Sequence, residues 1–492
     1  MRSSTLRIIG GPFTAMIVYI LLPEGAWVSD GREVVLTSQG RIAIAAASWM
    51  AFWWMTEAIP VAATALLPLI AFPLFGLMPI DVLSASYAHP LIFLFLGGFL
   101  VSIAIEKWSL HSWVSRRVIR LAGTNPRHIV GAFMLVSAVA SMWISNTATA
   151  IMMLPIAVAV IATVEGSEGE SEHTAFARCL MLGIAYGASL GGTATLIGSP
   201  PNLFVASYLR EHFDLTISFA EWMLVASPVV VIMLPLTWVL LTRWLMPLSD
   251  IKAYGAVLAT PPRWRDLPTA AHRVAFIFML LVLAWVTRPY LVGMHWAGWA
   301  PFVHLNDTVI ALAAGLSLFI VSSGEADDRL LTWADAARLP FGTLILFGGG
   351  LALAATIVTT GADEFIGAQL SALRQVPSWV TVLAVVSGIV FLTEMTSNTA
   401  TTTTLAPILA AAAAFMAFDV SALLIVTALA ASAAFMMPVA TPPNAIVFGS
   451  GQIELPQMMK AGVWLNVLGV VVIMVVSWFL LEPAVGIDLF GE

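Results

Sequence analysis

Long uncharged stretches alternate along this chain with short clusters of charged residues. The uncharged stretches include residues 58–80, 82–105, 129–164, 179–209, 222–242, 308–324, 339–362, 420–453 and 461–481. Most of them reach the roughly 20 residues that a helix needs to cross a bilayer. Their apolar side chains lie on all sides of a helical projection rather than on one face, as in segments that are surrounded by lipid or protein. The pattern predicts an all-α polytopic membrane protein in contact with the lipid bilayer.

Arginine and lysine residues gather in two segments. The first contains Lys107, Arg116, Arg117, Arg120 and Arg127, and the second contains Arg243, Lys252, Arg263, Arg265 and Arg273. By the positive-inside rule, both segments should lie on the cytoplasmic side of a cell (inner) membrane. Arg2 and Arg7 precede an apolar run through Leu22 that no small-residue cleavage pattern follows. We therefore expect a retained first span and a cytoplasmic N-terminus.

Segment 128–163 must contribute an even number of crossings, because two spans already separate the two basic segments. Ser145, Asn146 and Thr147 lie at its midpoint and divide it into two short arms. A re-entrant hairpin entered from the cytoplasm explains this pattern, and two short spans joined by a tight turn satisfy the parity equally. At about 1.5 Å per residue such arms barely cross a ~30 Å core, which favours the hairpin.

A second segment of the same kind covers residues 378–417, with Ser397, Asn398 and Thr399 at its centre. The spans expected between the two hairpins lie near 179–209, 222–242, 274–292, 306–322 and 340–358. Because their number is odd, the second hairpin enters from the opposite face, and the two halves have inverted topology. With the flanking spans, the sequence predicts about 11 transmembrane helices plus two re-entrant hairpins.

Each hairpin tip is followed by a helix that a pair of prolines interrupts. The tips read Ser145-Asn146-Thr147-Ala148-Thr149 and Ser397-Asn398-Thr399-Ala400-Thr401. The breaks read Ile197-Gly198-Ser199-Pro200-Pro201-Asn202 and Val439-Ala440-Thr441-Pro442-Pro443-Asn444. Identical tips that are each followed by a small residue, a hydroxyl residue, two prolines and an asparagine indicate an internal duplication.

A double proline removes two backbone donors and stops a helix, which leaves unpaired carbonyls before the break and unpaired amides after it. In hydrocarbon such groups cost several kcal/mol each unless they line a cavity or bind something. Carbonyls at a half-helix C-terminus suit a dehydrated monovalent cation, and amides at a half-helix N-terminus suit an anion. We therefore expect each tip and break to hold one cation beside a shared anion site.

Composition narrows the chemistry further. Only 10% of residues are charged, the formal net charge is −7, and Cys179 is the single cysteine. No basic arm indicates a nucleic-acid partner, and the absence of a His-Glu-x-x-His pattern disfavours a zinc enzyme. A serine hydrolase is disfavoured because no Gly-x-Ser-x-Gly elbow or histidine partner accompanies Ser145 or Ser397. The tips and breaks contain no lysine, arginine or histidine. An anion there would be held by dipoles, neutral donors and bound cations, so its binding should depend on the cation.

Two carboxylates lie close to apolar segments and are candidates by default for a functional role. Glu394 lies three residues before the second tip, where we expect it to cap or brace the hairpin rather than to ligate directly. Glu57 lies just before Pro60, where we expect it at the membrane interface.

These residues resemble those of the divalent anion/sodium symporter family, the dicarboxylate and sulfate transporters of the ion transporter superfamily. The resemblance covers nearly the whole chain. It is carried by Trp53-Trp54-Met55-Thr56-Glu57-Ala58-Ile59-Pro60 with Thr64 to Pro68, by Leu96-Gly97-Gly98-Phe99 with Ile105-Glu106-Lys107, by both Ser-Asn-Thr tips, and by Ala431-Ser432-x-x-Phe435-x-x-Pro438-Val439-Ala440-x-x-x-Asn444-x-Ile446-Val447. One departure is Ser199, where threonine is common in the family, which leaves the substrate preference more open than the site.

The resemblance implies a homodimer with a static scaffold, and a transport domain that carries substrate across by an elevator-like movement. It implies two sodium sites and no organic cofactor. The first sodium site would use Ser141, Ser145, Asn146 and the carbonyl of Gly198, and the second would use Thr393, Thr396, Asn398 and the carbonyl of Ala440. Substrate carboxylates would meet Ser145, Asn146 and Thr147 on one side and Ser397, Asn398 and Thr399 on the other, above a floor of Ser199, Pro200, Thr441 and Pro442.

The expected division of the chain follows the duplication. Scaffold helices of the two halves should occupy mainly residues 1–127 and 222–377, the two halves of the transport domain 128–221 and 378–458, and the last helix with the C-terminus 459–492. The leading hypothesis is sodium-coupled symport of a small dicarboxylate, most simply a four-carbon acid such as succinate. Sulfate import, sodium-independent dicarboxylate exchange, an anion channel and an intramembrane enzyme stay open as alternatives.

Overall fold

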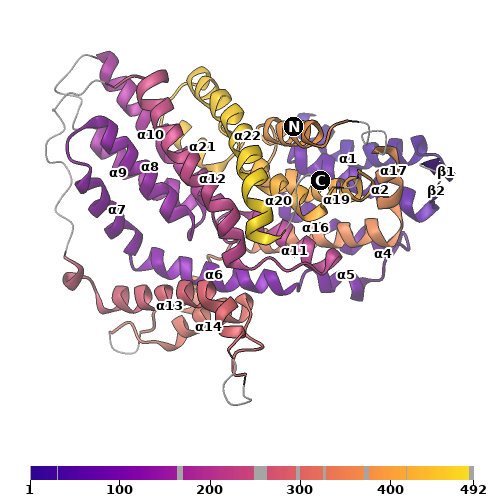
Figure 1. Cartoon of the computed structure of the whole chain (residues 1–492), viewed down its shortest axis with the longest axis horizontal. Helices are drawn as coiled ribbons and strands as arrows, with labels where there is room; N and C mark the ends of the chain where they lie inside the picture. Colours follow the sequence, from indigo (N-terminus) through magenta and orange to yellow (C-terminus); the bar gives the residue numbers. More distant parts are fainter. Residues whose placement is uncertain are drawn as a thin grey trace.

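The computed structural model describes residues 2–29, 32–162, 170–248, 263–294, 300–324, 328–370, 376–416 and 418–486. Nearly all of its regular structure is helical (Figure 1). The elements that precede the first hairpin are α1 (Arg2–Leu21), β1 (Gly25–Ser29), β2 (Arg32–Leu36), α2 (Ser38–Thr56), α3 (Val61–Thr64), α4 (Leu67–Leu74), α5 (Ile80–Ser86), α6 (Pro90–Lys107) and α7 (Leu110–Leu121). Between the two hairpins lie α12 (Phe219–Val239), which continues as the π-helix η1 (Leu240–Leu245), then η2 (Trp264–Asp266), α13 (Thr269–Val292), α14 (Asp307–Ile320), α15 (Trp333–Ala336), α16 (Phe341–Thr359) and α17 (Ala362–Leu370). The last helix is α22 (Leu455–Val485).

Both predicted hairpins are pairs of helices that meet at the predicted polar tips. The first consists of α8 (Pro126–Ser141) and α9 (Asn146–Ala162), and the second of α18 (Ser378–Leu392) and α19 (Asn398–Met416). In each hairpin the second arm begins at the asparagine of the Ser-Asn-Thr motif. The tips therefore place two helix N-termini, with their partial positive charge, at corresponding positions of the two halves.

The helix that follows each hairpin is interrupted at the proline pair. In the first half α10 (Glu170–Thr193) ends before the break and α11 (Pro200–Phe213) starts at its first proline. In the second half α20 (Val420–Ala431) and α21 (Pro442–Phe448) are related in the same way. Both half-helices after the breaks have prolines at their first two positions, where the missing N–H groups have no helical partner in any case.

Six helical segments within the described residues are long and apolar enough to cross a membrane: Ile80–Lys107, Thr174–Thr193, Phe219–Leu245, Thr269–Val292, Phe341–Thr359 and Leu455–Pro483. Several other apolar helices, including both hairpin arms of the first half, have fewer than 18 residues. At about 1.5 Å per residue these two arms reach only about 24–26 Å, somewhat less than a ~30 Å core, and their re-entrant arrangement stays a prediction. The total of about 11 spans stays a prediction.

One small element departs from the helical architecture and was not predicted. Strands β1 and β2 form a two-stranded antiparallel sheet in which Trp27 pairs with Val34. Val34 and Leu36 are buried against Phe365 and Ala368 of α17, and this packing stabilises a hairpin that would be marginal in water alone. The sequence signal was a run of β-branched and aromatic residues around an Asp-Gly pair, which favours tight hairpin turns. That pair itself lies outside the described residues.

The hairpins and broken helices pack against each other and against flanking helices. α8 and α9 both pack on α10, whereas α18 and α19 both pack on α20. α13 and α14 pack along α6 at the lower edge in Figure 1, and α1, α2, α17 and the β-hairpin gather at the right-hand end. The largest hydrophobic core joins both hairpins and both broken helices, and a second core lies between α2, α4 and α16.

Glycines allow the flanking helices α6 and α16 to approach their neighbours closely. A Cβ atom on Gly97 of α6 would lie 2.8 Å from the backbone nitrogen of Leu312 and closer still to the carbonyl of Ala311 in α14. A Cβ atom on Gly349 of α16 would lie 2.7 Å from the Cα atom of Ala65. Backbone atoms cannot yield as a flexible side chain can, so both helices depend on glycine at these positions.

We predict that Gly97→Ala lowers the free energy of unfolding by about 1–3 kcal/mol, because the added methyl group pushes α6 away from α14. Thermal unfolding of the purified protein in detergent measures the change. Gly388→Ala is the matched control, since Gly388 lies within α18 and a methyl group added there would meet no other group within 4 Å. It should leave stability unchanged or raise it slightly. Equal effects of the two changes would contradict this account of α6.

Candidate functional site

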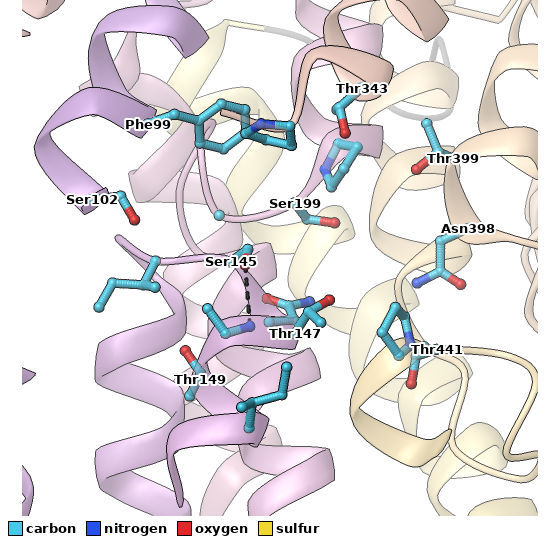
Figure 2. Close-up of a pocket in the computed structure, with 18 of the residues that line it drawn as sticks. Phe99, Ser102, Ser145, Thr147, Thr149, Ser199, Thr343, Asn398, Thr399 and Thr441 are labelled. Atoms are coloured by element: carbon cyan, nitrogen blue, oxygen red, sulfur yellow. Dashed lines mark hydrogen bonds between the residues drawn. The ribbon is translucent and has the colours of Figure 1, made fainter. Parts of the chain in front are cut away.

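Both tips and both breaks line one cavity of about 900 Å³ (Figure 2). Of the predicted site residues, those that line it are Ser145, Asn146, Thr147, Gly198, Ser199, Pro200, Ser397, Asn398, Thr399, Ala440, Thr441 and Pro442. The remaining three, Ser141, Thr393 and Thr396, are buried behind the tips. The structure thus brings together residues that are about 250 positions apart in the chain, as the inverted repeat predicted.

The two halves interlock at this cavity. The second arm of the first hairpin, α9, contacts α21 of the second half, and α19 contacts α11 of the first half. The hydroxyl groups of Ser199, in the first break, and Ser432, before the second break, lie 3.3 Å apart within hydrogen-bond distance. Each tip therefore faces the break of the other repeat as well as its own.

The first tip is surrounded by oxygen atoms. The acceptors around Asn146 assign its amide nitrogen to the inner position, from which it donates to Ser141 Oγ and, over 3.3 Å each, to the carbonyl oxygens of Gly198 and Ala188. Hydroxyl, amide and carbonyl oxygens of this kind are neutral ligands suited to a monovalent cation. Three of these four residues belong to the predicted first sodium site, and Ala188 is an addition that the sequence did not single out.

Glycine makes this arrangement possible. A Cβ atom on Gly192 would overlap the Asn146 side chain, and one on Gly198 would lie 3.0 Å from the carbonyl oxygen of Ser141. Neither glycine has positive φ. Close approach, rather than backbone conformation, therefore requires glycine at these two positions.

The second tip repeats the arrangement with different side chains. Thr393 Oγ1 lies 2.8 Å from Asn398 Oδ1 and 2.9 Å from the carbonyl oxygen of Ala431. Thr396 Oγ1 lies 2.6 Å from Thr401 Oγ1. In both halves a hydroxyl residue contacts the tip asparagine five positions later, so this pair corresponds to Ser141 and Asn146. The assignment of these oxygens to sodium stays a prediction.

The asparagine after each proline pair satisfies the carbonyls that the break exposes. Asn202 Nδ2 lies 3.2, 3.1 and 2.8 Å from the carbonyl oxygens of Gly192, Thr193 and Thr195. Asn444 Nδ2 lies 3.4 and 3.1 Å from those of Ala434 and Met437. Both asparagine residues are fully buried. The sequence showed these asparagines as part of the breaks, but their role as carbonyl partners depends on the three-dimensional path of the loop.

The expected free amides after the breaks are largely absent, which corrects that part of the sequence interpretation. Prolines occupy the first two helical positions, the Asn202 amide donates to the Ser199 carbonyl at 3.2 Å, and the Asn444 amide donates to Thr441 Oγ1 at 3.4 Å. The unpaired backbone amides lie instead at the tips. Within the described residues, the backbone amides of Asn146 and Thr147, which begin α9, have no hydrogen-bond acceptor.

The corresponding amides of Asn398 and Thr399, at the start of α19, are also without an acceptor in the part of the chain that the structure describes. These pairs of N–H groups belong to helices of 17 and 19 residues, so the helix dipoles add to them. Ser145 partly caps the first tip, because its hydroxyl accepts from the Ala148 amide at 3.2 Å (Figure 2). The two tips thus present amide donors to one cavity from two directions.

Glu394 braces the second hairpin against the second break. Its carboxylate accepts from the amides of Phe435, Met436 and Met437 at 2.6, 2.9 and 2.9 Å, and from Asn466 Nδ2 of α22 at 2.7 Å. These four donors stabilise a buried charge that would otherwise be unfavourable. The observed contacts match the bracing role that the sequence favoured, and the corresponding position of the first half is Met142.

Flanking helices complete the cavity wall. Phe99 and Ser102 of α6 and Thr343 of α16 line it together with the tips and breaks (Figure 2). None of the three was predicted as a site residue. An all-round apolar helix does not reveal which of its sides faces a cavity, so the sequence carries no signal that could have found them.

The charged and titratable residues of the cavity lie at the ends of elements rather than at the tips. They are Glu57, Glu106, His111 and Arg338. Glu57 is exposed and caps α2 with φ of 46°, and Arg338 forms an ion pair with Glu106 at the end of α6. Next to this pair, Lys107 Nζ lies 2.8 Å from Asp335 Oδ2. Among the residues that the structure describes, no group of three or more His, Cys, Asp or Glu side chains forms a metal cluster.

We predict that Gly192→Ala displaces the Asn146 side chain and weakens cation binding at the first tip. In the unchanged protein, sodium should raise the thermal unfolding temperature more than potassium does at equal ionic strength, because binding favours the folded state. The variant should lose at least half of this difference. Gly469→Ala in α22, where the new methyl group meets only ordinary contacts of 3.6 Å or more, should retain it. A full sodium response in Gly192→Ala would exclude the proposed cluster.

We also predict that Glu394→Ala lowers the free energy of unfolding by about 3 kcal/mol, because it leaves buried amides without their charged acceptor. Asn466→Ala removes one of the four donors and should cost about half as much. Thermal unfolding in detergent compares the two variants. If they are equally stable, the carboxylate does not hold the second break.

Comparison with known proteins places the chain in a family. A family model described as citrate transporter matches residues 51–422. The sodium-dependent dicarboxylate transporter SdcS of Staphylococcus saprophyticus is 38% identical over 463 residues, which cover 92% of this chain and 88% of the relative. The protein of the same name from Staphylococcus aureus is 38% identical over 461 residues, again covering 92% and 88%.

Solved membrane transporters share the fold at low identity. The YdaH transporter of Alcanivorax borkumensis superimposes with a TM-score of 0.61 at 14% identity, covering 98% of this chain and 97% of that one. MtrF of Neisseria gonorrhoeae, described in a class of antimetabolite efflux pumps, gives a TM-score of 0.59 at 11% identity, covering 97% and 94%. The match to the family model covers more than half of the chain and agrees with the resemblance found in the tips and breaks. This integral membrane protein therefore belongs to the citrate transporter family.

Proposed function

We propose that this protein is a secondary active transporter that couples sodium movement to symport of small dicarboxylates, such as succinate, malate or fumarate. The observation that carries the proposal is the single cavity between two opposed Ser-Asn-Thr tips, each backed by a cluster of neutral oxygens. No lysine, arginine or histidine lies in the tips or breaks. A doubly charged anion would therefore need captured cations for its neutralisation.

The substrate is proposed to bridge the tips. One carboxylate would accept hydrogen bonds from the Ser145, Asn146 and Thr147 side, and the other from the Ser397, Asn398 and Thr399 side. Ser199, Pro200, Thr441 and Pro442 would form the floor between them. Two helix N-termini that face one cavity match a ligand with a negative group at each end better than a compact anion. The Staphylococcus relatives, which are named sodium-dependent dicarboxylate transporters, support the same substrate class.

Two sodium ions would complete the site, one at each tip. The first would bind Ser141, Ser145, Asn146 and the Gly198 carbonyl, and the second Thr393, Thr396, Asn398 and the Ala440 carbonyl. With the amide orientation that the surrounding acceptors favour, the Asn146 nitrogen satisfies the carbonyl of Gly198. An arriving sodium ion would take over these oxygens and turn the amide so that its oxygen also faces the ion.

The proposed movement is that of an elevator within a homodimer. Residues 128–221 and 378–458 would form the transport domain, with the last helix and C-terminus at 459–492, and residues 1–127 and 222–377 would supply most of the scaffold. Interlocking of the tips and breaks of both halves supports their movement as one unit. The glycines Gly98 and Gly350 face Ile197 and Phe204 across this boundary, so little side-chain volume obstructs sliding there.

The protein is proposed to lie in the inner membrane of the cell. In the described conformation its cavity is proposed to open toward the cytoplasm. Glu106 and Arg338 form part of the cavity wall at the basic end of α6, the side that the positive-inside rule assigns to the cytoplasm. At the other end of α6, His89 lies 3.9 Å from Glu211 of α11. Nearby, the Phe219 amide at the start of α12 donates to Asp307 of α14 at 3.0 Å, which holds this end of the protein together away from the opening.

Uptake into proteoliposomes tests the proposal. Labelled succinate should accumulate when sodium is higher outside than inside and should not accumulate with potassium. Asn146→Ala and Asn398→Ala should each reduce uptake at least tenfold, because each removes a group shared by cation and anion sites. Asn306→Ala is the matched control, since Asn306 caps α14 outside the cavity and its loss should affect stability by about 1 kcal/mol rather than transport.

The same assay separates the other functions. Succinate uptake that requires internal succinate and ignores sodium would indicate an exchanger. Sodium-driven uptake of sulfate but not of succinate would show that the substrate is sulfate rather than a dicarboxylate. Flux with neither counterflow nor a fixed ratio to sodium would indicate a channel. A chemically altered substrate would indicate an enzyme. Undiminished uptake in both asparagine variants would show that the tips do not form the binding site.

A further inference from the structure

Helix α7, which joins α6 to the first hairpin, has a sequence pattern unlike that of the apolar helices. Its 12 residues, Leu110–Leu121, place Trp113, Arg116, Arg117 and Arg120 at positions i, i+3, i+4 and i+7, and hence on one face. Ser115 and Ile119 lie on the opposite face and are buried against the protein. At about 1.5 Å per residue the helix is only about 18 Å long, too short to cross a bilayer. α7 thus has the pattern of an amphipathic helix at the membrane surface.

The three arginines of this face have no protein counter-charge. Arg116, Arg117 and Arg120 are all exposed, and within the described residues none of them forms an ion pair or a hydrogen bond. The Arg117 guanidinium carbon lies 6.0 Å from the centre of the Trp113 ring, which orients the charge without neutralising it. Burial lowers the pKa of His111, so the positive charge of α7 comes from these arginines.

A second segment enlarges the surface. The ring of Trp264 in η2 meets the Trp113 ring edge to face, with centroids 5.1 Å apart. Its neighbours Arg263 and Arg265 are exposed and form no ion pair with a described residue. Asp266 is the neighbouring acidic residue, and its carboxylate accepts from the Arg263 backbone amide at 3.1 Å. Two tryptophans are therefore accompanied by five arginines, although the chain as a whole carries a formal charge of −7.

Apolar side chains accompany these charges. Leu121 and Val114, which are seven positions apart and so share a side of α7, are 82% and 42% exposed, and Trp264 is 40% exposed. An exposed apolar strip beside exposed arginines would be unfavourable in water. It matches the boundary between acyl chains and phosphate groups, where both kinds of side chain find partners.

We propose that this surface binds the headgroups of anionic phospholipids. The surface, called here the α7 surface, consists of Trp113, Val114, Arg116, Arg117, Arg120, Leu121, Arg263, Trp264 and Arg265. Its arginines contact phosphate oxygens, and its apolar side chains enter the layer just below them. Each arginine near an anionic membrane surface contributes on the order of a fivefold gain in affinity.

The position of α7 gives this binding a structural consequence. α7 starts directly after α6 and ends before α8, the first arm of the hairpin that carries the Ser145 tip (Figure 1). An anchored α7 holds this connection in the plane of the membrane surface. The inference concerns lipid binding alone, so it stands or falls independently of the transported substrate.

The test uses the full-length protein in detergent, with thermal unfolding measured during titration with phosphatidylglycerol or phosphatidylcholine. Phosphatidylglycerol should raise the unfolding temperature at lower concentration than phosphatidylcholine does, and the difference should shrink as salt rises. The triple variant Arg116→Gln, Arg117→Gln, Arg120→Gln should require at least tenfold more phosphatidylglycerol. The matched triple change to lysine keeps the charges and should retain most of the preference.

Other outcomes would overturn the proposal. A glutamine variant with an undiminished preference would place lipid binding elsewhere, and equal stabilisation by inorganic phosphate would indicate a site for free anions. If the triple variant does not fold, Arg263→Gln with Arg265→Gln provides a second test at the edge of the same surface. The absence of any difference between the two lipids in the unchanged protein would refute the proposal without a variant.

Discussion

The structure depends on how broken helices satisfy their backbone polar groups inside an apolar protein. A break exposes carbonyls and amides that cannot be left unpaired in hydrocarbon. Here the two sides of each break are treated differently: Asn202 and Asn444 donate to the carbonyls, and proline pairs remove the amides. The breaks are therefore nearly self-sufficient. Backbone amides that remain unpaired within the described residues lie at the hairpin tips, where α9 and α19 begin.

This arrangement separates two tasks that the sequence interpretation had assigned to the same breaks. In the proposed site, amide donors and helix dipoles at the tips face the anion, while hydroxyl, amide and carbonyl oxygens behind the tips suit cations. The two repeats hold the oxygen cluster behind each tip in different ways. Gly192 lets Asn146 approach the first break closely, whereas Glu394 ties the second hairpin to its break through four donors. Similar clusters thus rest on backbone proximity in one half and on a buried carboxylate in the other.

The sequence predicted the hairpins, the breaks and their meeting because polar motifs stand out within apolar runs and recur at corresponding positions. It did not predict the cavity wall from Phe99 and Thr343, since an all-round apolar helix gives no sign of which side faces the site. The amide prediction failed because the prolines that stop the helix also remove its first donors. The β-hairpin was missed although its sequence carried a turn signal, because its stability comes from packing on α17.

The distribution of fixed charge is compatible with the proposed movement of the site through a membrane. A permanent guanidinium or ammonium group at the tips would have to cross the low-dielectric core whenever the site was empty, and an unpaired charge there is highly unfavourable. Dipoles and neutral oxygens carry no net charge, so the empty site avoids this penalty. Arginines occur instead at the surface, as on α7, where water and lipid headgroups solvate them. The proposed sodium coupling follows from this constraint, because the ions that neutralise the substrate must arrive with it and leave with it.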